Sequence, residues 1–364
     1  MAVKKRKVKP LGILIILFLL ASVFLISVGG SFIYLGSPVD KNDKENIEVE
    51  IKSGSSSSSI GKVLKEKGLI RSDFYFKIYL KLYEINDLKA TTYQFNKSMS
   101  TAEIISELQK GNGYNPDEIS ITIQEGLNMR QIATIISSKT NNTYDEVIAK
   151  SNDEVYIRTL IDKYWFITED VLNPNIYYKL EGYIYPDTYA LVNKDVDVEY
   201  IFNKMVAEMA KHLEPYKDFD YSTMTIHQRI TLASMVEKEG PVLEDRTKMA
   251  SVFVNRVARG MSLGSDVTTR YAIKLDEKRP MSAAEYATKS PYNTRLIDGS
   301  MNGKLPVGPI AAVSKSSIDA AFNPDSTPYI YFVSNIQTNE TFFYVNKNDF
   351  DKKVKELESV NKGY

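Results

Sequence analysis

The stretch that decides the fold is Thr225-Ile-His-Gln-Arg-Ile-Thr-Leu-Ala-Ser-Met-Val-Glu-Lys-Glu-Gly-Pro241, which predicts one helix with both ends marked. Thr225 followed three residues later by Gln228 has the form of a capping box, and Gly240 before Pro241 is a stop signal. At about 100° per residue, the apolar side chains cover one broad arc, so we expect the helix to pack against a core. Three polar side chains fall on the opposite arc: Thr231, Ser234 and Lys238.

Glu239 falls inside the apolar arc, in the last turn of the predicted helix. Burial and the negative end of the helix dipole both raise the pKa of a carboxyl. A carboxyl that keeps its proton near neutral pH can act as a general acid. The alternative is that Glu239 is a surface residue at a frayed helix end, and the residues by themselves leave both interpretations open.

The amino-acid composition limits the kinds of partner and of catalytic chemistry that are possible. The 364 residues leave room for two or three domains, and 46 basic residues balance 46 acidic ones, which gives no global attraction to nucleic acid. The absence of cysteine, with only His212 and His227, excludes thiol chemistry, disulfides and the usual Cys/His zinc sites. We therefore expect no metal and no cofactor, and chemistry carried by carboxylates, hydroxyls, amides and basic groups.

The N-terminal region predicts a membrane anchor. No charged residue occurs between Pro10 and Val39, and the apolar run 11–36 exceeds the roughly 20 residues that cross a bilayer. Basic residues precede this run and acidic residues follow it, so the positive-inside rule places residues 1–10 in the cytoplasm and the rest outside. We predict an uncleaved transmembrane helix over 11–36 and a linker over 37–46, because a signal peptide has a shorter apolar region, of about 7–15 residues.

Two segments share a strand, turn and helix pattern. Residues 47–51 alternate apolar and charged side chains, Gly54 follows, and apolar residues at helical spacing come next. The same pattern returns over 119–140, where Gly126 matches Gly54. We interpret this as a degenerate internal repeat, although common strand and helix patterning could also produce it by chance.

The remaining periodicity predicts an α+β chain. Helices are expected over 74–83, 101–109, 144–165, 244–260 and 314–321, and strands over 91–95, 329–334 and 341–345. Four polar loops, 180–189, 264–266, 290–295 and 305–310, are expected to form a cleft around Glu239. The first of them is rich in tyrosine, whose ring can stack on a sugar.

Five segments carry a resemblance to a known family: Leu232–Glu239, Ser251–Arg256, Ser290–Thr294, Leu305–Ile310 and Tyr329–Val333. In order and spacing they resemble the YceG-like family of endolytic murein transglycosylases, and Glu181-Gly182 with Tyr185–Tyr189 matches a further family stretch. The resemblance implies a transmembrane helix, a LysM-like α+β module over 47–112, and a mixed α/β catalytic region over 113–364 with its core at 175–364. Val267 and Val307 stand where the family commonly has proline, which concerns the shape of two loops.

The resemblance also implies a reaction. The family's catalytic glutamate is the second of a Glu-Lys-Glu motif, which corresponds to Glu239 rather than Glu237. Glu239 would protonate the glycosidic oxygen between MurNAc and GlcNAc and then deprotonate the muramyl C6 hydroxyl as it attacks C1. The product is a 1,6-anhydro-MurNAc end, and cleavage within nascent strands would end their elongation. A hydrolytic glycosidase normally needs two carboxylates, whereas this reaction can proceed with one.

Nine further residues are expected to bind substrate or shape the site. Tyr292 and Asn293 are expected to stabilise charge, while Asp266, Asn255 and Arg256 shape the cleft or hold the acid. The other four come from the same motifs: Ser265, Thr294, Glu181 and Tyr185.

The expected partners are peptidoglycan glycan strands and synthases of the elongation or division machinery, without nucleic acid. Two alternatives stay open. One is a peptidoglycan-binding scaffold without activity, and the other is a hydrolytic muramidase that pairs Glu239 with Asp266 or Asp245.

Overall fold

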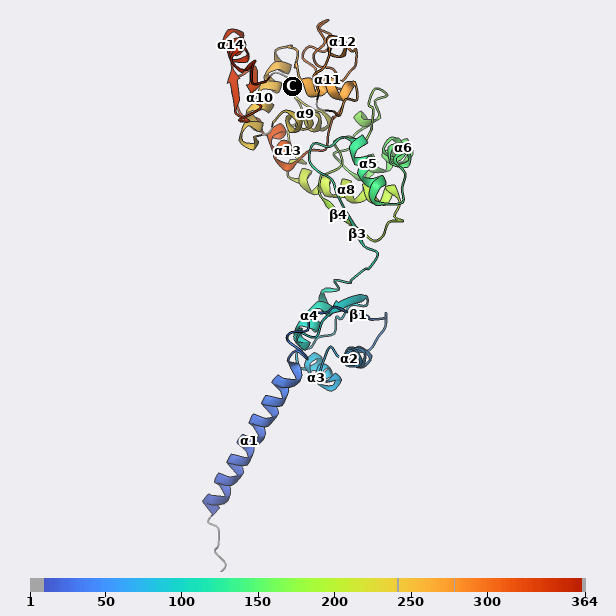
Figure 1. The fold of residues 1–364 in the computed structure, drawn as a ribbon, viewed down its shortest axis with the longest axis vertical. Coiled ribbons are helices and arrows are strands. Elements are labelled where there is room, and N and C mark those ends of the chain that lie inside the picture. Colours follow the sequence, from blue (N-terminus) through green and yellow to red (C-terminus); the bar gives the residue numbers. More distant parts are fainter. Residues whose placement is uncertain (1–9, 241, 278, 362–364) are drawn as a thin grey trace, which may run out of the picture. The chain divides into compact units, whose positions relative to one another are not determined.

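The structure is a computed structural model, and it describes residues 10–240, 242–277 and 279–361. It divides into two compact units, Met1–Pro116 and Asp117–Tyr364. Within the described residues, strands form three separate two-stranded antiparallel sheets among many helices, which confirms an α+β fold (Figure 1). Residues 1–9 of the predicted cytoplasmic segment, and Pro241 of the predicted helix stop, lie outside the described residues.

The first unit begins with α1 (Pro10–Gly36). Across the part of the chain that the structure describes, no helix is long and apolar enough to cross a membrane. After α1 come five short elements: β1 (Ile47–Glu50), α2 (Ser57–Glu66), α3 (Asp73–Leu82), β2 (Thr92–Phe95) and α4 (Thr101–Lys110). β1 and β2 are antiparallel, with Val49 opposite Tyr93. Buried side chains from all five form one core, which includes Val49, Leu64, Phe76, Tyr93 and Ile104.

The second unit opens with a second sheet and its helices: β3 (Ile119–Thr122), α5 (Met129–Lys139), α6 (Tyr144–Asn152), α7 (Glu154–Lys163), β4 (Thr188–Leu191) and α8 (Val198–Leu213). β3 pairs with β4 in antiparallel register. The predicted helical stretch 144–165 is two helices, because Asp153 ends α6 and its carboxylate accepts the backbone N–H groups of Val155 and Tyr156 at the start of α7.

The central helix of this unit is α9 (Ile226–Glu239), and its capping box between Thr225 and Gln228 is confirmed. It packs against α10 (Arg246–Ala258), α11 (Asp266–Ala272) and α13 (Lys315–Phe322). On the arc opposite the apolar one, Lys238 is exposed, whereas Thr231 and Ser234 have no exposed surface, so the helix is covered on this side as well. Their hydroxyls donate to the backbone carbonyls of His227 and Thr231, which satisfies them inside the core.

The chain ends in α12 (Ala283–Tyr286), α13, the hairpin β5 (Tyr331–Ser334) and β6 (Thr341–Tyr344), and α14 (Lys347–Leu357). The predicted hairpin is therefore present. One of its faces packs on α10, where the rings of Phe253 and Phe332 meet edge to face.

Each of the two predicted strand–turn–helix segments has that structure. β1 and α2 are joined through Gly54, and β3 and α5 through Gly126, with φ of 80° and 74°. Such left-handed φ values favour glycine, since a Cβ there would clash with the backbone. The glycine at each turn is therefore explained by the local backbone conformation. That the two segments arose by duplication stays a prediction.

Candidate active site

Glu239 is the last residue of α9, and the residue as a whole is half-buried. The Ser265 hydroxyl donates a hydrogen bond to Glu239 Oε1 at 2.7 Å. Burial raises the pKa of Glu239 to about 7, and the nearby Asp266 carboxylate acts in the same direction. The Ser265 hydrogen bond and two arginines oppose this rise. Glu239 therefore keeps a proton near neutral pH, as a general acid must.

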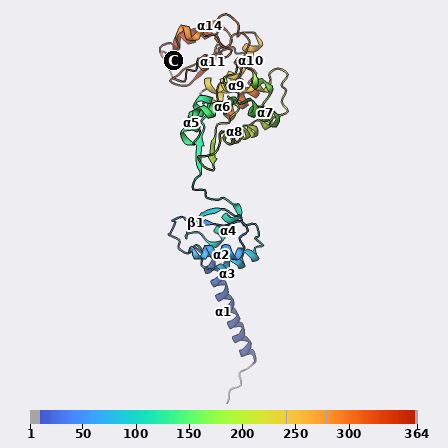
Figure 2. The same cartoon turned by 90° about the vertical axis from the view of Figure 1, so that its right-hand side faces the viewer.

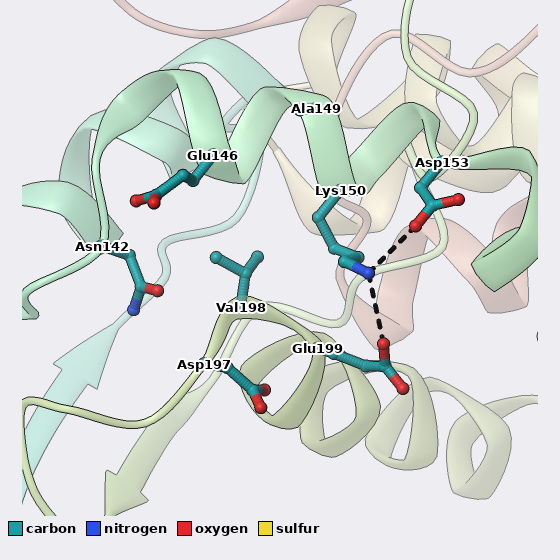
Figure 3. Close-up of a pocket in the computed structure, with 8 residues that line it drawn as sticks. All are labelled: Asn142, Glu146, Ala149, Lys150, Asp153, Asp197, Val198 and Glu199. Atoms are coloured by element: carbon teal, nitrogen blue, oxygen red, sulfur yellow. Dashed lines mark hydrogen bonds and ion pairs between the residues drawn. The ribbon is translucent and has the colours of Figure 1, made fainter.

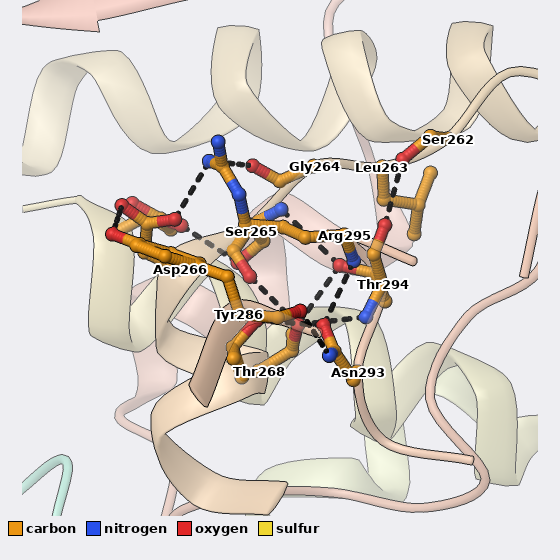
Figure 4. Close-up of polar contacts among 12 residues, drawn as sticks. Ser262, Leu263, Gly264, Ser265, Asp266, Thr268, Tyr286, Asn293, Thr294 and Arg295 are labelled. Atoms are coloured by element: carbon orange, nitrogen blue, oxygen red, sulfur yellow. Dashed lines mark hydrogen bonds and ion pairs between the residues drawn. The ribbon is translucent and has the colours of Figure 1, made fainter. Parts of the chain in front are cut away.

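Ser265 is held by a small network of hydroxyls. Its backbone N–H donates to Thr294 Oγ1 at 3.1 Å, and its carbonyl accepts from Thr268 Oγ1 at 2.7 Å. The two threonine hydroxyls lie 2.8 Å apart, and all three residues are buried (Figure 4). Because Ser265 is bonded on both sides, its hydroxyl is fixed relative to the end of α9.

An ion pair forms the exposed rim of the site. Arg295 Nη1 lies 2.6 Å from Asp266 Oδ1, and the two side chains are 42% and 46% exposed. The Arg295 guanidinium also lies over the ring of Tyr286, 5.1 Å from its centre (Figure 4). Solvent therefore reaches the residues directly beside the half-buried acid.

Asn255 and Arg256 connect α10 to the C-terminal hairpin. The Asn255 amide donates to the carbonyls of Thr327 and Tyr329, at 2.8 and 2.9 Å. Arg256 donates to the carbonyls of Ile330 at 2.6 Å and, from the loop before Ser265, of Leu263 at 2.7 Å. Arg256 thus fixes the loop that carries Ser265, and its positive charge lowers the pKa of Glu239.

Glu237, two residues before the acid, has a different environment. Its side chain is 5% exposed and forms an ion pair with Arg246 at 3.1 Å. It also accepts the backbone N–H of Ser314 at 2.9 Å, just before α13. A glutamate held by an arginine and a backbone amide is a structural group, which here joins α9, α10 and α13.

Glu181 is a second buried carboxyl. It is 1% exposed, and burial raises its pKa to about 7. Both of its oxygens accept the backbone N–H of Met129, the first residue of α5, at 2.9 and 3.0 Å. The Tyr271 hydroxyl donates to it at 2.9 Å. Glu181 is sealed in the core, so the structure places it away from any exposed surface.

The other predicted binding residues are mostly internal. Tyr292 has no exposed surface and packs its ring 4.7 Å from Tyr177 and 4.8 Å from Tyr271. Asn293 is also fully buried, and its amide donates to the carbonyls of Tyr286 and Thr288. In this conformation neither can touch a glycan.

Tyr185, in the first of the four loops, stacks on a histidine. Its ring lies 3.7 Å from the ring of His212, with 7° between the planes. Tyr185 is 8% exposed, so little of its own surface remains for a sugar.

Of the four predicted loops, two meet at Glu239 and two lie along the rest of α9. The 264–266 and 290–295 loops supply the hydroxyl network and the ion pair at the acid. The 305–310 loop ends where Ile310 N donates to Ser234 Oγ at 3.0 Å, and Tyr183 of the 180–189 loop hydrogen-bonds His227 at 2.7 Å. These last two loops support the helix instead of surrounding its end.

Three residues beside Ser265 and Asp266 were not among the predicted binding residues: Thr268, Tyr286 and Arg295, the last of which lies in the predicted 290–295 loop. Arg295 directly follows the Ser290–Thr294 motif, so its position was a usable signal. Tyr286 ends a four-residue helix whose start, Ser282 with Glu285, carries a capping box that sequence reading could have found.

A cavity of about 500 Å³ lies elsewhere in the unit, between α6 and α8 (Figure 3). Eight residues line it: Asn142, Glu146, Ala149, Lys150, Asp153, Asp197, Val198 and Glu199. Lys150 pairs there with Asp153 at 3.0 Å and Glu199 at 3.2 Å. Hydrogen bonds lower the pKa of Asp153 and Glu146, so these two are charged acceptors and not proton donors. Among the described residues, no group of three or more carboxylates or imidazoles is arranged to hold a metal ion.

Comparison with known proteins gives consistent matches. The model of the YceG-like family matches residues 49–356. The endolytic murein transglycosylase of Bacillus subtilis (strain 168) is 36% identical over 340 residues, which is 92% of this chain and 92% of that protein. The endolytic murein transglycosylase of Streptococcus pneumoniae serotype 2 (strain D39) is 35% identical over 91% of this chain, and the match covers 63% of that longer protein.

A solved structure shows the same architecture. The crystal structure of a putative YceG-like protein from Listeria monocytogenes superimposes with a TM-score of 0.60 at 34% sequence identity. The match covers 85% of this chain and 99% of that one.

Proposed function

The chain belongs to the YceG-like family, and from that premise we propose that it is an endolytic murein transglycosylase with Glu239 as its acid and base. One observation carries the assignment. Glu239 has a pKa raised to about 7 and lies beside a solvent-exposed rim, so a protonated carboxyl is within reach of a substrate.

Glu239 would act twice in one reaction. Its proton passes to the glycosidic oxygen as the bond from MurNAc C1 breaks, which releases GlcNAc as the leaving alcohol. The resulting carboxylate then takes the proton of the muramyl C6 hydroxyl as O6 bonds to C1. The 1,6-anhydro end forms, Glu239 is protonated again, and no water is consumed.

Ser265 would set the direction of both proton transfers. Because its hydroxyl donates to Oε1, the proton of neutral Glu239 belongs on Oε2. Once Glu239 is ionised, the same hydrogen bond becomes charge-assisted and stabilises the carboxylate that must act as the base. Thr268 and Thr294 hold Ser265 in place for this role.

Positive charge on the sugar ring would be met by the carboxylates of Glu239 and Asp266. The two nearby arginines are already engaged, Arg295 with Asp266 and Arg256 with backbone carbonyls. Tyr292 and Asn293 have no exposed surface, so we propose for them a role in holding the Ser290–Arg295 loop instead of direct contact with the sugar.

Asp266 also supports a second candidate function. It is a carboxylate close enough to raise the pKa of Glu239, and a hydrolytic muramidase needs a second carboxylate to activate water or attack the sugar. The observation that favours this role is its position at the exposed rim, where Arg295 holds its side chain at 2.6 Å.

The wider setting is also proposed. The uncharged run 11–36 after a basic cluster supports a membrane anchor with the catalytic unit outside the cytoplasm. The 47–112 segment would act as a LysM-like module on peptidoglycan. Cleavage of nascent strands beside their synthases would then end strand elongation.

The test is digestion of purified glycan strands followed by mass analysis of the ends. Anhydro-MurNAc ends in internal cleavage products support the proposal. Reducing MurNAc ends would identify a muramidase. Intact strands would leave only a binding role.

A further inference from the structure

Helix α3 carries an apolar stripe that the rest of its unit leaves uncovered. Phe74, Ile78 and Leu82 follow one another at four-residue intervals, so they lie on one face. They are 64%, 37% and 62% exposed, whereas Phe76 and Leu80 on the opposite face are buried in the core. We call these three side chains the α3 stripe.

One border of the α3 stripe is the contact between α3 and α1. At about 100° per residue, Tyr75 lies directly next to Leu82 around the helix. The Tyr75 ring packs on Phe32 of α1, with 4.6 Å between ring centres. The stripe therefore continues onto the apolar surface of α1. Figures 1 and 2 both show α3 beside the C-terminal end of α1.

The geometry of this junction is fixed by Arg71, just before α3. Its guanidinium donates to the Tyr34 hydroxyl at 3.1 Å and to the carbonyls of Pro38 and Val39 at 2.7 and 3.0 Å. The start of α3 is thus bonded to the end of α1 and to the residues that follow it. A surface that holds the end of α1 also holds α3.

The other border of the α3 stripe is basic. Lys77 and Lys81 lie next to Phe74 around the helix, on the side away from Tyr75. A row of rings runs along the other side, from Tyr75 through Tyr79 to Tyr83, with centres 6.0 and 4.4 Å apart. Lysine beside apolar residues is typical of helices that lie in a membrane surface, and tyrosine is enriched at that depth.

We propose that the α3 stripe lies in the headgroup region of the bilayer, with Lys77 and Lys81 directed to anionic lipid phosphates. This inference rests on the proposed membrane attachment through α1. A second copy of the chain is a poorer occupant, because three side chains offer far less than the roughly 800 Å² per partner of a stable interface. The stripe would hold the first unit against the membrane, which an anchor helix alone would not do.

The test uses the full chain, which has no cysteine of its own, so that a single introduced cysteine carries a label at a known place. Phe74→Cys, Ile78→Cys and Leu82→Cys are each coupled to a fluorophore sensitive to polarity and reconstituted in vesicles containing phosphatidylglycerol. Ala102→Cys on the exposed face of α4 is the control for water, and Val23→Cys in α1 is the control for membrane insertion.

We expect blue-shifted emission at 74, 78 and 82, with most of the intensity lost when the lipids carry a nitroxide near the headgroup, and no change at 102. Water-like emission at the three positions with a buried label at 23 overturns the inference and leaves the anchor standing. A blue shift without lipid quenching also overturns it, because protein then covers the stripe. A water-like label at 23 overturns the membrane attachment itself, and glycan cleavage by the same samples tests the enzymatic proposal separately.

Discussion

Two glutamates of the second unit have the same raised pKa, about 7, in opposite settings. Glu239 is at the C-terminal end of α9, where the helix dipole disfavours its charge, and it receives one hydrogen bond from Ser265. Glu181 lies at the N-terminal end of α5, where the dipole favours its charge, and it receives bonds from Met129 and Tyr271. A raised pKa is common to both, so it reports burial and not function.

The two glutamates differ in how far solvent and substrate can reach them. Glu239 is beside Asp266 and Arg295, whose side chains are almost half exposed, whereas Glu181 is enclosed at 1% exposure. Only the first can exchange a proton with a polymer as large as a glycan strand. Glu181 instead fixes the start of α5 to the 180–189 loop, and Lys238 fixes the preceding turn by donating to the carbonyl of Gly126 at 3.0 Å.

The largest expected effect is the loss of glycan cleavage in Glu239→Gln, and it tests the contrast between Glu239 and Glu181 directly. Glu239→Gln keeps the shape and the Ser265 hydrogen bond but cannot transfer a proton, so cleavage should fall by about 10²–10⁴-fold or more. Glu181→Gln should keep most of its activity per folded molecule, because Glu181 does not reach substrate. Anhydro ends counted by mass spectrometry, with circular dichroism to count folded protein, give both numbers.

The control for this pair is Glu237→Gln, two residues away on the same helix. Breaking the buried pair with Arg246 should lower stability by about 3–5 kcal/mol while folded molecules still cleave. If folded Glu181→Gln or Glu237→Gln loses cleavage and Glu239→Gln retains it, the assignment of the acid is wrong.

The second effect concerns the hydrogen bond that sets Glu239 apart. Ser265→Ala removes a bond to a group that must be charged during the reaction, worth about 1.5 kcal/mol or more, so kcat should fall roughly tenfold. The same change removes an influence that lowers the pKa of Glu239, so activity should persist to higher pH than in the wild type. A slower enzyme with an unchanged pH profile would show that Ser265 only supports the loop. Ser265→Thr should restore much of the rate.

A third, smaller effect distinguishes a mechanism with one catalytic carboxylate from a mechanism with two. In a transglycosylase, Asp266→Asn should lower the rate only a few-fold, and it should shift the alkaline fall in activity to lower pH, opposite to Ser265→Ala, because Asp266 raises the pKa of Glu239. A muramidase that uses Asp266 would lose about 10²-fold or more. It would also show a fall in activity at acid pH in the wild type, which Glu239 by itself does not require.

The sequence predicted the features that depend on residues close together in the chain. The box between Thr225 and Gln228, the turn at Gly54 and the turn at Gly126 depend on residues a few positions apart, and all are present. The position of Glu239 in the last turn of its helix followed from the same periodicity. Its match to the family motif then selected it over Glu237, which the helical wheel could not do.

The features that the sequence did not predict depend on packing between segments that are distant in the chain. The helical pattern did not show that Thr231 and Ser234 are buried: Ile310 of the 305–310 loop donates to Ser234 Oγ, and small hydroxyls can be buried when their own helix accepts their hydrogen bonds. Arg295 lies near Glu239 because Thr294 and Ser265 bring the 264–266 and 290–295 loops together. These two loops were expected at Glu239, but no spacing rule specifies the hydrogen bonds that join them.

The smallest expected effect is on stability, and the two glutamates differ in it near pH 5. The pKa of Glu239 is about 7 in the folded chain and near 4.5 when unfolded, so between these values the folded state binds more protons and stability falls as pH rises. Glutamine does not titrate, so Glu239→Gln should match the wild type near pH 5 and exceed it near pH 8, by roughly 3 kcal/mol at most or a few degrees in Tm. Glu181→Gln should already be less stable than the wild type near pH 5, because its new NH₂ group would face the N–H of Met129, where two oxygens now accept it. Because the pKa of Glu181 is also raised to about 7, this deficit should shrink near pH 8. Thermal melts of the three proteins at both pH values decide this. An equal gain for Glu239→Gln at pH 5 and pH 8 would mean that proton binding is not its cause.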